Sequence, residues 1–515
     1  MYLNISRYKK YTRVRILEKV LIRGKRITRL VEHVGSARNE TELAVLRITA
    51  KERLVALRPQ RSLLDTLEQQ IHDPARLTIT HSYAYGLWHI IGGLYDGIGL
   101  PDNFLKYLVL ARIALPKSKL STTRYLADNL NRVVNVQSIY DYMDTLKKDT
   151  LMPLLLDYAR KQTKQRTGQT IAVVFYDVTT LYFETDEEDE DTLKEPGLRK
   201  KGYSKDHRGD LPQVVVGLTV DGGGFPLDFQ VYEGNTYEGH TLIDGILSIQ
   251  VKLSLTPGDL TVIADAGMLS QANIDALEES GYIYIVGARI KSLNKTRTDE
   301  LLSWDYANQG MMDVVLDAPV NRRLIVTYSD KRAKRSQQNR DRLVKKLQVK
   351  LDHGQVVKKS KYIILHTADN AATPLKTTAL TGSIDQSKLD QDARFDGLKG
   401  YVTNTVLTAE EVVARYANLW TVEKSFRMSK SDLRTRPVFH FKKRRIIAHL
   451  LICICSLAVL RELEQKITSL QPAAGLSIAL EQLLAIRQYT LHIPNQPAVE
   501  VYSQLTSIQE QLMRL

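Results

Sequence analysis

The chain has 515 residues, of which 43% are hydrophobic, and carries a formal net charge of +14 at pH 7. The length is too great for one small domain and predicts two to four modules, and the excess of positive charge favours a polyanionic partner. The two cysteines, Cys453 and Cys455, lie together in an apolar run, which excludes a disulfide scaffold and a cysteine zinc cluster. Residues 1–10 contain no apolar segment typical of a signal peptide, so we expect a cytoplasmic protein without membrane attachment.

The first part of the chain is basic and mainly helical. Residues 8–16 alternate polar and apolar side chains, which predicts a strand. Helical spacing of apolar residues, interrupted at prolines 101 and 116, then predicts a series of helices at 62–71, 84–97, 102–115, 121–130 and 138–160.

From residue 170 the pattern changes from helices to strands. Helical spacing predicts only two helices in the next hundred residues, at 240–253 and 271–280. Apolar or alternating runs predict strands at 171–176, 213–220, 227–232, 260–264 and 282–286. The order is three strands followed by alternating helices and strands, which predicts an α/β domain.

The segment that follows this domain is predicted to contain strands and a charged helix. The strands are at 323–328 and 361–366, and the helix is at 331–350. Residues 398–404 are predicted to return to the first sheet.

The last part of the chain, from about residue 437, is predicted to be helical. The apolar run 446–460 is shorter than the ~20 residues that usually span a membrane, and it is interrupted by His449, so it predicts a buried core helix. Residues 478–487 and 499–512 have the spacing of amphipathic helices.

Three acidic residues are the most informative feature of the chain. Asp177 follows the predicted strand 171–176, Asp265 follows the predicted strand 260–264, and Glu423 lies in an amphipathic helix. Carboxylates at the ends of buried strands and on a later helix can converge on one pocket and bind hard divalent cations through oxygen. Two Mg²⁺ ions roughly 3.5–4 Å apart serve in-line phosphoryl transfer. A single strand-terminal Asp is more often a turn former, so the prediction rests on the three residues together.

The segment around Glu423 carries the most specific pattern. It is a predicted helix over 408–430 that begins with a capping box of Thr408 and Glu411. Tyr416, Glu423 and Lys430 in this helix match the Tyr-x2-Arg-x3-Glu-x6-Lys signature of bacterial insertion-sequence transposases of the DDE type, in the family typified by insertion sequence four. Residues 175–183 resemble that family's first aspartate block, and residues 262–267 resemble its second.

The resemblance covers roughly residues 170–450 and departs from the signature at one position. The signature Arg is Leu419 in this chain. In the family this Arg usually contacts the DNA backbone, so the contact is absent here or is made by Arg415 or Arg427.

The resemblance implies a division of the chain into four regions. Residues 1–165 would be a basic N-terminal and helical DNA-binding region. Residues 166–288 and 396–436 would form a ribonuclease-H-like catalytic core of α/β class, interrupted by a β-rich insertion at 289–395. Residues 437–515 would form a helical C-terminal region.

The resemblance also implies an activity, cofactors and partners. The chain would be a DNA transposase that binds the ends of an insertion sequence, cleaves DNA and transfers strands. Asp177, Asp265 and Glu423 would be the catalytic residues and would hold two Mg²⁺ ions, with Mn²⁺ able to substitute. The partners would be double-stranded DNA, both transposon ends and target, and a second copy of the chain in a synaptic complex. No nucleotide cofactor is expected.

Further residues are expected to contact DNA. Lys430 would pair with a phosphate near the cleaved end, and Tyr416 would hydrogen-bond the same backbone. An aromatic ring that stacks on a flipped base is expected in a hairpin mechanism, although Trp420 is better explained as a core residue. The predicted DNA-binding set is Tyr416, Lys430, Arg427, Lys205, Arg208 and Trp420, of which Lys205 and Arg208 are equally explained as residues of a solvated loop.

Two other interpretations remain open. A ribonuclease-H-like nuclease or a domesticated recombinase would use the same pocket without mobilising an element. A non-catalytic DNA-binding inhibitor of transposition would not need the three carboxylates. The acidic run 184–191 is predicted to be a solvated hairpin loop, with an acidic flap that competes with DNA as the alternative.

Overall fold

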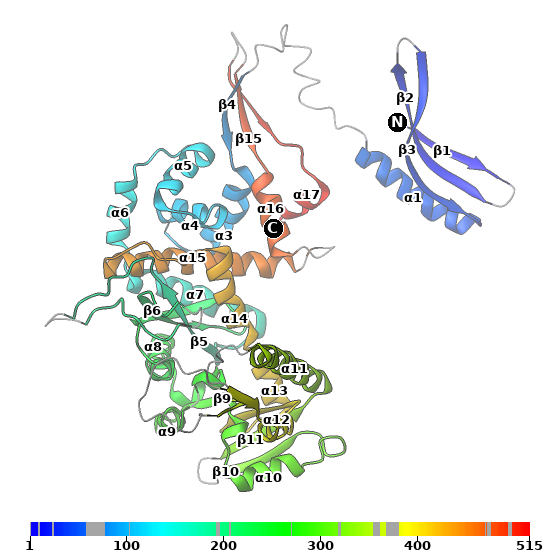
Figure 1. Cartoon of the computed structure of the whole chain (residues 1–515). Helices are drawn as coiled ribbons and strands as arrows, with labels where there is room; N and C mark the ends of the chain where they lie inside the picture. The colour runs from blue at the N-terminus through cyan, green and yellow to red at the C-terminus, as the bar shows by residue number, and fades with distance from the viewer. Residues whose placement is uncertain are drawn as a thin grey trace. The chain divides into compact units, whose positions relative to one another are not determined.

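The chain divides into two compact units, which are described separately (Figure 1). The first comprises Met1–Ser82 and Gln488–Ser503, and the second comprises Tyr83–Arg487 and Gln504–Leu515. The computed structural model describes residues 2–8, 11–22, 25–57, 78–101, 104–191, 196–204, 208–268, 270–317, 321–353, 361–366, 381–468, 470, 475–492 and 497–515. The predicted helix at 62–71 lies outside these residues.

The first unit contains two small antiparallel sheets. One has the order β1-β2-β3 and carries a helix, α1, with Val14, Ala37, Leu43 and Ala50 in a common core. The other has the order β16-β15-β4. The bounds are β1 Tyr2–Arg7, β2 Thr12–Ile22, β3 Lys25–Ala37, α1 Glu40–Leu57, β4 Thr78–Tyr83, β15 Gln488–His492 and β16 Val499–Tyr502.

Two predictions for this unit need correction. The predicted strand 8–16 is confirmed only from Thr12 onward, where β2 begins. The predicted helix at 499–512 is wrong in its first part, because residues 499–502 form β16 and pair with β15. Only Ser507–Leu512, named α17, is helical, and it belongs to the second unit.

The second unit begins with a helical layer around one long helix, α15. The bounds of the helices in this layer are α3 Gly92–Ile98, α4 Phe104–Ala114, α5 Lys119–Leu130, α6 Val136–Thr145, α7 Lys148–Thr167, α15 Lys443–Ile467 and α16 Leu476–Ala485, with a π-helical turn at Leu87–Ile91. Helix α15 contacts α3, α4, α6, α7 and α16. The helix predicted at 138–160 is two helices, because Leu146 and Lys147 adopt extended backbone conformations between α6 and α7.

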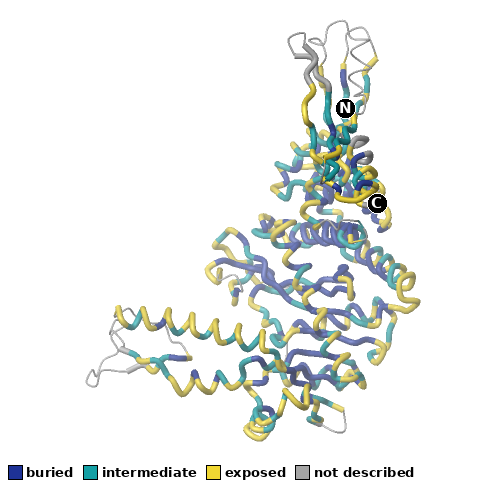
Figure 2. Tube along the Cα trace, turned by 90° about the vertical axis from the view of Figure 1, so that its right-hand side faces the viewer, coloured by how far each residue is buried: buried dark blue, intermediate teal, exposed yellow. Residues whose placement is uncertain are grey.

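The apolar run at 446–460 is the centre of α15. Within the described residues, α15 alone is long and apolar enough to cross a membrane, but 94% of its most apolar window is buried inside the protein. Figure 2 shows this helix as a mostly buried segment. The prediction of a buried core helix is therefore confirmed.

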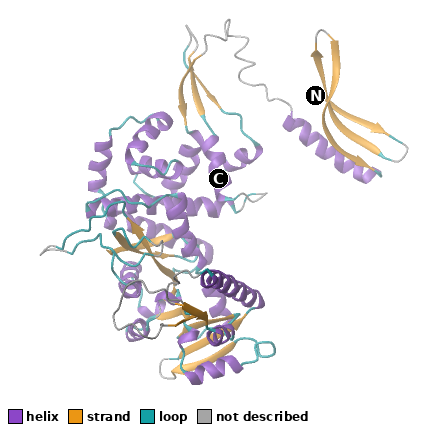
Figure 3. Cartoon of the chain, in the orientation of Figure 1, coloured by secondary structure: helices purple, strands orange, loops and turns teal. Residues whose placement is uncertain are grey.

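Below the helical layer lies an eight-stranded mixed sheet with the order β10-β11-β14-β9-β8-β5-β6-β7 (Figure 3). Strands β5, β8 and β9 are mutually parallel, and the other neighbouring strands are antiparallel. The bounds are β5 Val173–Tyr182, β6 Gln213–Val220, β7 Pro226–Glu233, β8 Thr261–Ala264, β9 Ile283–Ala288, β10 Met312–Asp317, β11 Arg322–Tyr328 and β14 Leu398–Thr403.

The five strands β7-β6-β5-β8-β9 have the ribonuclease-H-like topology. The first three strands form an antiparallel meander, and the next two are added parallel to the first through helical crossovers. The crossovers contain α8, Leu242–Leu253, and α9, Gln271–Glu279. Every residue of β6 is buried, as expected for a strand covered on both faces, and this explains its nearly continuous apolar sequence. The predicted α/β, ribonuclease-H-like class is confirmed.

The segment between β9 and β14 contains both helices and strands. Strands β10 and β11 extend the main sheet beyond β14. The predicted charged helix is α11, Asp330–Asp352, which buries only Leu347. The remaining elements are α10 Lys295–Ser303, β12 Ile363–His366, β13 Thr381–Ile384 and α12 Gln386–Ala393.

Candidate active site

Two aspartates are brought side by side by the register of β5 and β8. The parallel pairs run from Val173 with Thr261 to Tyr176 with Ala264, so the next residues along the chain are Asp177, still within β5, and Asp265, just past the end of β8. Strand β8 ends at Ala264, as predicted. The prediction that Asp177 follows a strand is wrong, because Asp177 is the fifth residue of β5.

The contacts of the preceding residue, Tyr176, show to which face of the sheet the Asp177 side chain points. The hydroxyl of Tyr176 donates to Thr241 at the start of α8, and a Cβ added at Gly245 of α8 would meet the Tyr176 ring. Successive side chains of a strand point to opposite faces. Asp177 therefore points away from α8.

The third carboxylate comes from a helix that packs on the same strand. Glu423 lies on α14, Trp420–Arg427, which contacts β5 and β6. The predicted single helix at 408–430 is three pieces: α13, Ala409–Ala417; α14; and a π-helical turn, Met428–Asp432. Between α13 and α14 the backbone bonds tighten to i−3, as in a 3₁₀ helix. The predicted capping box of Thr408 and Glu411 is confirmed.

Tyr416 and Lys399 connect Asp265 with Glu423. The hydroxyl of Tyr416, a buried residue of α13, donates to Asp265 Oδ1 at 3.2 Å. Lys399 of β14 places its ammonium 4.6 Å from the centre of the Tyr416 ring. Burial and the Arg332 guanidinium lower the pKa of Lys399, while the carboxylates of Asp265 and Glu423 oppose that shift. Both carboxylates therefore act on the same ammonium.

The pKa of Tyr416 is raised by burial and by the Asp265 carboxylate, so its hydroxyl remains protonated and can donate. The structure thus places the predicted DNA-contacting Tyr416 on a predicted catalytic carboxylate. Sequence reasoning missed Lys399, because nothing in the alternating run 398–404 indicates which of its side chains faces the carboxylates.

A further carboxylate, Glu238, lies near Asp265 and was also missed. It begins a short 3₁₀ helix before α8. A Cβ added at Gly267 would lie 4.0 Å from an oxygen of Asp265 and 4.0 Å from an oxygen of Glu238. The loop after Asp265 is held by Arg289, which donates to the carbonyl oxygens of Ala266 and Gly267 at 3.1 and 3.2 Å.

The donor chemistry of this site suits a hard cation, although the carboxylates do not surround one point. Across the described ranges, no three side chains of His, Cys, Asp or Glu are grouped closely enough to hold one metal ion. Asp177 and Asp265 each follow the last paired residues of β5 and β8, and the carboxylates of Asp265 and Glu423 both oppose the lowering of the Lys399 pKa. Mg²⁺ commonly takes one or two protein carboxylates and completes its shell with water and phosphate oxygens, so these carboxylates fit it.

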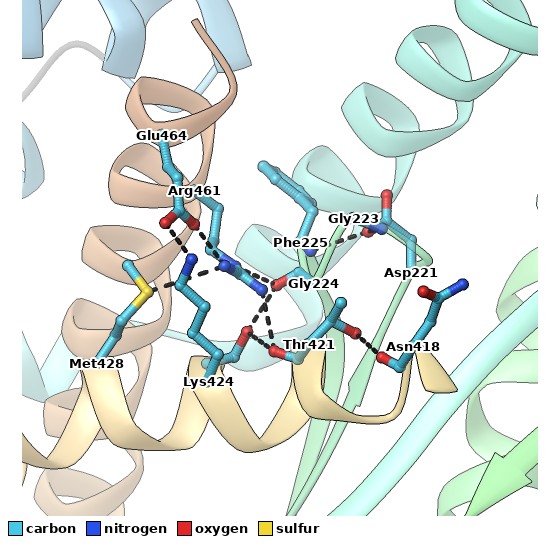
Figure 4. A network of polar contacts seen from close by, with 11 residues as sticks. Asp221, Gly223, Gly224, Phe225, Asn418, Thr421, Lys424, Met428, Arg461 and Glu464 are labelled. Carbon is cyan, nitrogen blue, oxygen red and sulfur yellow. Dashed lines mark hydrogen bonds and ion pairs between the residues drawn. The ribbon is translucent and has the colours of Figure 1, made fainter. Parts of the chain in front are cut away.

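The helix of Glu423 is fixed by a buried arginine of α15 (Figure 4). Arg461 of α15 is 2% exposed and donates to the carbonyl oxygens of Thr421 and Gly224 at 2.9 and 3.0 Å. It also pairs with Glu464 at 2.5 Å, and Lys424 of α14 binds the other oxygen of the same carboxylate. This network joins α14, α15 and the turn between β6 and β7.

Gly224 in this turn must be glycine for two reasons. Its φ is +79°, in the left-handed region, and a Cβ there would lie 1.6 Å from an Arg461 nitrogen. Its carbonyl also accepts from Ser425 of α14 at 2.9 Å. The Gly222–Gly224 segment was predicted only as a turn, and its role in holding α14 depends on Arg461, more than 200 residues away in sequence.

The other predicted DNA-binding residues differ from one another in exposure and in contacts. Trp420 is 52% exposed, so its expected place in the core is wrong, and the Lys424 ammonium lies 5.3 Å from its ring centre. Arg427 is exposed, and Lys430 is half-buried in the π-helical turn after α14. Arg208 is exposed and pairs with Asp210 at 3.3 Å. Lys205 lies outside the described residues.

Leu419, at the position of the signature Arg, is 5% exposed and belongs to the main hydrophobic core. It therefore packs where the family signature has a charged side chain.

The acidic run 184–191 lies in the connection between the antiparallel strands β5 and β6 and is mostly exposed, as predicted for a solvated loop, although two of its acids are paired. Asp189 accepts from the Arg199 side chain at 2.7 Å and from its backbone N–H at 2.9 Å. Asp191 pairs with Lys200 at 2.9 Å. The run is folded against the basic segment 199–201, which neutralises part of its charge.

Comparisons with known proteins were made for both sequence and structure. A family model described as the transposase DDE domain matches residues 168–459, which is more than half of the chain. No curated protein matches the chain.

Among solved structures, a piggyBac transposase synaptic complex with hairpin DNA is 9% identical, with 84% of this chain and 78% of that chain covered and a TM-score of 0.37. A Mos1 transposase paired-end complex with the left transposon end is 11% identical, with 35% and 56% covered and a TM-score of 0.16. A pre-cleavage Mos1 transpososome is 12% identical, with 35% and 57% covered and a TM-score of 0.15. The family assignment rests on the model match: the matched span contains β5, β8, α14 and most of α15, and the chain belongs to the family of transposase DDE domains.

Proposed function

We propose that the protein is a DNA transposase that binds the ends of an insertion sequence, cleaves DNA and transfers strands. The proposal assigns catalysis to Asp177, Asp265 and Glu423, which hold two divalent cations, Mg²⁺ with Mn²⁺ able to substitute. One observation carries it: the register of β5 and β8 places Asp177 beside Asp265, and the helix of Glu423 packs on the same strand.

When bound, the cations lower the pKa of the attacking water or 3′-hydroxyl and neutralise charge at phosphorus. The residues of the chain supply the oxygens and hold them in place. Asp177 is held by its position inside β5. Asp265 is held by the Tyr416 hydroxyl, and the segment that carries Glu423 is held by Arg461. Lys399 supplies a cation with which the Asp265 and Glu423 carboxylates both interact favourably.

The proposal also assigns DNA as the partner. The net charge of +14 favours a polyanion, and the transposase DDE domain family acts on DNA. Trp420 offers an exposed ring three residues before Glu423, where it can stack on a base. Lys430 and Arg427 supply positive charge on the segment after Glu423, and Arg208 supplies it near β5. Two copies of the chain would pair two transposon ends in a synaptic complex.

The test is cleavage of supercoiled DNA that carries the element's own ends, in Mg²⁺ and in Mn²⁺. Asp177→Asn, Asp265→Asn and Glu423→Gln are each expected to reduce nicking to background while DNA binding stays near the wild-type level. Glu410→Gln on the exposed side of α13 is the matched control and should cleave normally. A variant that keeps near-normal metal-dependent cleavage removes its residue from the site.

Strand transfer separates a transposase from a nuclease. With a pre-cleaved end that carries a free 3′-hydroxyl, the wild-type protein should join that end to target DNA. Nicking without joining would identify a nuclease, and binding without nicking in either metal would identify a non-catalytic DNA-binding protein.

A further inference from the structure

A strongly basic cavity of about 490 Å³ lies between α4, α5 and the segment that follows the π-helical turn. Its volume is within the range of small-ligand sites. Five of the residues that line it are basic and none is acidic; the basic ones are Arg112, Lys117, Lys119, Arg434 and Arg436.

Two of these cations are buried without an acidic partner. Lys119 is 6% exposed and Arg112 is 7% exposed, and neither forms an ion pair with any residue that the structure describes. Within the part of the chain that the structure describes, the Arg112 side chain forms one hydrogen bond, and it is long, at 3.5 Å to the Leu433 carbonyl. Buried charges in proteins are normally paired with an opposite charge or lose their charge through a shifted pKa. An anion in the cavity would supply the missing partner of both Lys119 and Arg112.

An acid on α6, the helix of the cavity-lining Tyr140, is already engaged. Asp144 of α6 pairs with Arg444 and Arg445 of α15, each at 2.8 Å. Burial and the nearby Arg112 lower the pKa of Lys119 to about 7, and burial together with Lys119 and Arg112 lowers the pKa of His440 to about 3. Burial is the larger cause of both shifts, and the neighbouring cations add to it; His440 also lines the cavity, and a bound anion would favour the charged form of Lys119.

The start of α5 adds donors to the same cavity. Ser118 is the N-cap and accepts from the backbone N–H of Ser121 at 3.2 Å. The first-turn N–H groups of Lys119 and Leu120 have no partner within the helix, and such groups commonly bind phosphate. Arg434 also lines the cavity and has φ at +43°, a conformation that a residue other than glycine keeps only when its surroundings enforce it.

We propose that this cavity binds a phosphate group, with Lys119 and Arg112 as the buried cations and the N-terminus of α5 as a donor of N–H groups. The phosphate belongs either to a nucleic-acid strand or to a small phosphate such as inorganic phosphate or pyrophosphate. The proposal does not depend on DNA cleavage, since it concerns binding by the DNA-free protein.

The test uses the full chain without DNA. Binding of inorganic phosphate and of pyrophosphate is measured by calorimetry at constant ionic strength, with chloride as the counter-anion. The wild-type protein should bind saturably with one site. Lys119→Met keeps the length of the side chain, removes its charge and should weaken binding about tenfold or more, as expected for one charge-assisted hydrogen bond. Arg124→Gln removes an exposed charge from the same helix and should leave binding unchanged.

Thermal unfolding provides the folding control. Without phosphate, Lys119→Met should unfold at the same temperature as the wild type or higher, because it removes an unpaired buried charge. Phosphate should raise the midpoint of the wild type more than that of the variant at the same concentration. No saturable binding to the wild-type protein, or equal binding to Lys119→Met, would overturn the proposal.

Competition identifies the source of the phosphate. A short DNA strand is added to the wild-type protein and to Arg124→Gln, each with pyrophosphate bound. If the strand displaces pyrophosphate from the wild type but not from the variant, the strand binds through Arg124 and not through the cavity, and the proposal fails for DNA. If the strand displaces pyrophosphate equally from both, the cavity takes a strand phosphate. If pyrophosphate binds and no DNA displaces it, the cavity takes a free phosphate. The last two outcomes both support a phosphate site.

Discussion

Single residues of the candidate site differ in how they are held. Asp177 is fixed by its pairing with Leu218 of β6, whereas Asp265 lies just past the end of β8 and is contacted by the hydroxyl of Tyr416. A loop carboxylate has more freedom than one inside a strand, so the geometry of Asp265 should be sensitive to the loss of one hydrogen bond.

Tyr416→Phe is therefore expected to slow strand cleavage by about 10- to 100-fold, since a hydrogen bond to a charged group contributes about 1.5–3 kcal/mol. DNA binding should change little if the hydroxyl serves Asp265. The matched control is Tyr401→Phe, which removes a hydroxyl from the ring that packs against Tyr416 at 4.9 Å. Rates are measured in single-turnover cleavage. If Tyr416→Phe instead lowers the affinity for DNA and leaves the cleavage rate unchanged, the Tyr416 hydroxyl contacts DNA and does not position Asp265.

Leu419 gives a second prediction at this scale. Restoring the family's Arg at this position would place a charge in the core, because Leu419 is 5% exposed. Leu419→Arg should lower the free energy of unfolding by an amount on the order of 3–5 kcal/mol, as expected for an uncompensated buried charge. Leu419→Met should be nearly neutral. Urea unfolding measures both. An unchanged midpoint together with tighter DNA binding would show that this position opens toward DNA.

Among the elements, α14 depends most on contacts from far along the chain. The Arg461 guanidinium donates to the carbonyl of Thr421 in α14 and to the carbonyl of Gly224. The turn between β6 and β7 is therefore linked through Arg461 to the helix of Glu423. This coupling can be tested at the glycine without touching a carboxylate.

Gly224→Ala should destabilise the protein by about 1–2 kcal/mol from the left-handed backbone alone. It should also displace Arg461, so cleavage should fall while DNA binding persists. Gly222→Ala in the same turn is the control, because a Cβ there meets nothing within 4 Å. Thermal unfolding and cleavage are measured for both variants. If Gly224→Ala loses stability but cleaves at the wild-type rate once folded, Arg461 does not position Glu423.

Features that depend on residues close in the sequence could be predicted, whereas features that depend on residues far apart in the sequence could not. The end of β8 before Asp265 was predicted, because the apolar run stops there. The continuation of β5 past Asp177 was not, because it depends on pairing with β6. The capping box at Thr408 was predicted from four residues, whereas the break before Trp420 was not. Lys399, Glu238 and Arg461 could not be predicted, since each reaches the site only through tertiary packing.

For the whole molecule, charge gives the clearest prediction. If the proposed DNA complex forms through roughly six to ten phosphate contacts, its affinity should fall by about 10³- to 10⁵-fold between 50 and 200 mM salt. The measurement is a salt titration of binding by fluorescence anisotropy, and its slope gives the number of phosphates neutralised. A flat response would mean that the +14 charge is ordinary surface charge.

The position of Arg461 has a consequence for how the protein is made. All three carboxylates are present once synthesis has passed residue 423. The helix that carries Glu423 is fixed by Arg461 and Glu464, which are synthesised later. A growing or truncated chain that stops before α15 is complete would contain every proposed catalytic residue and still lack a fixed Glu423. The order of synthesis would therefore delay cleavage until the helical core that surrounds α15 has folded.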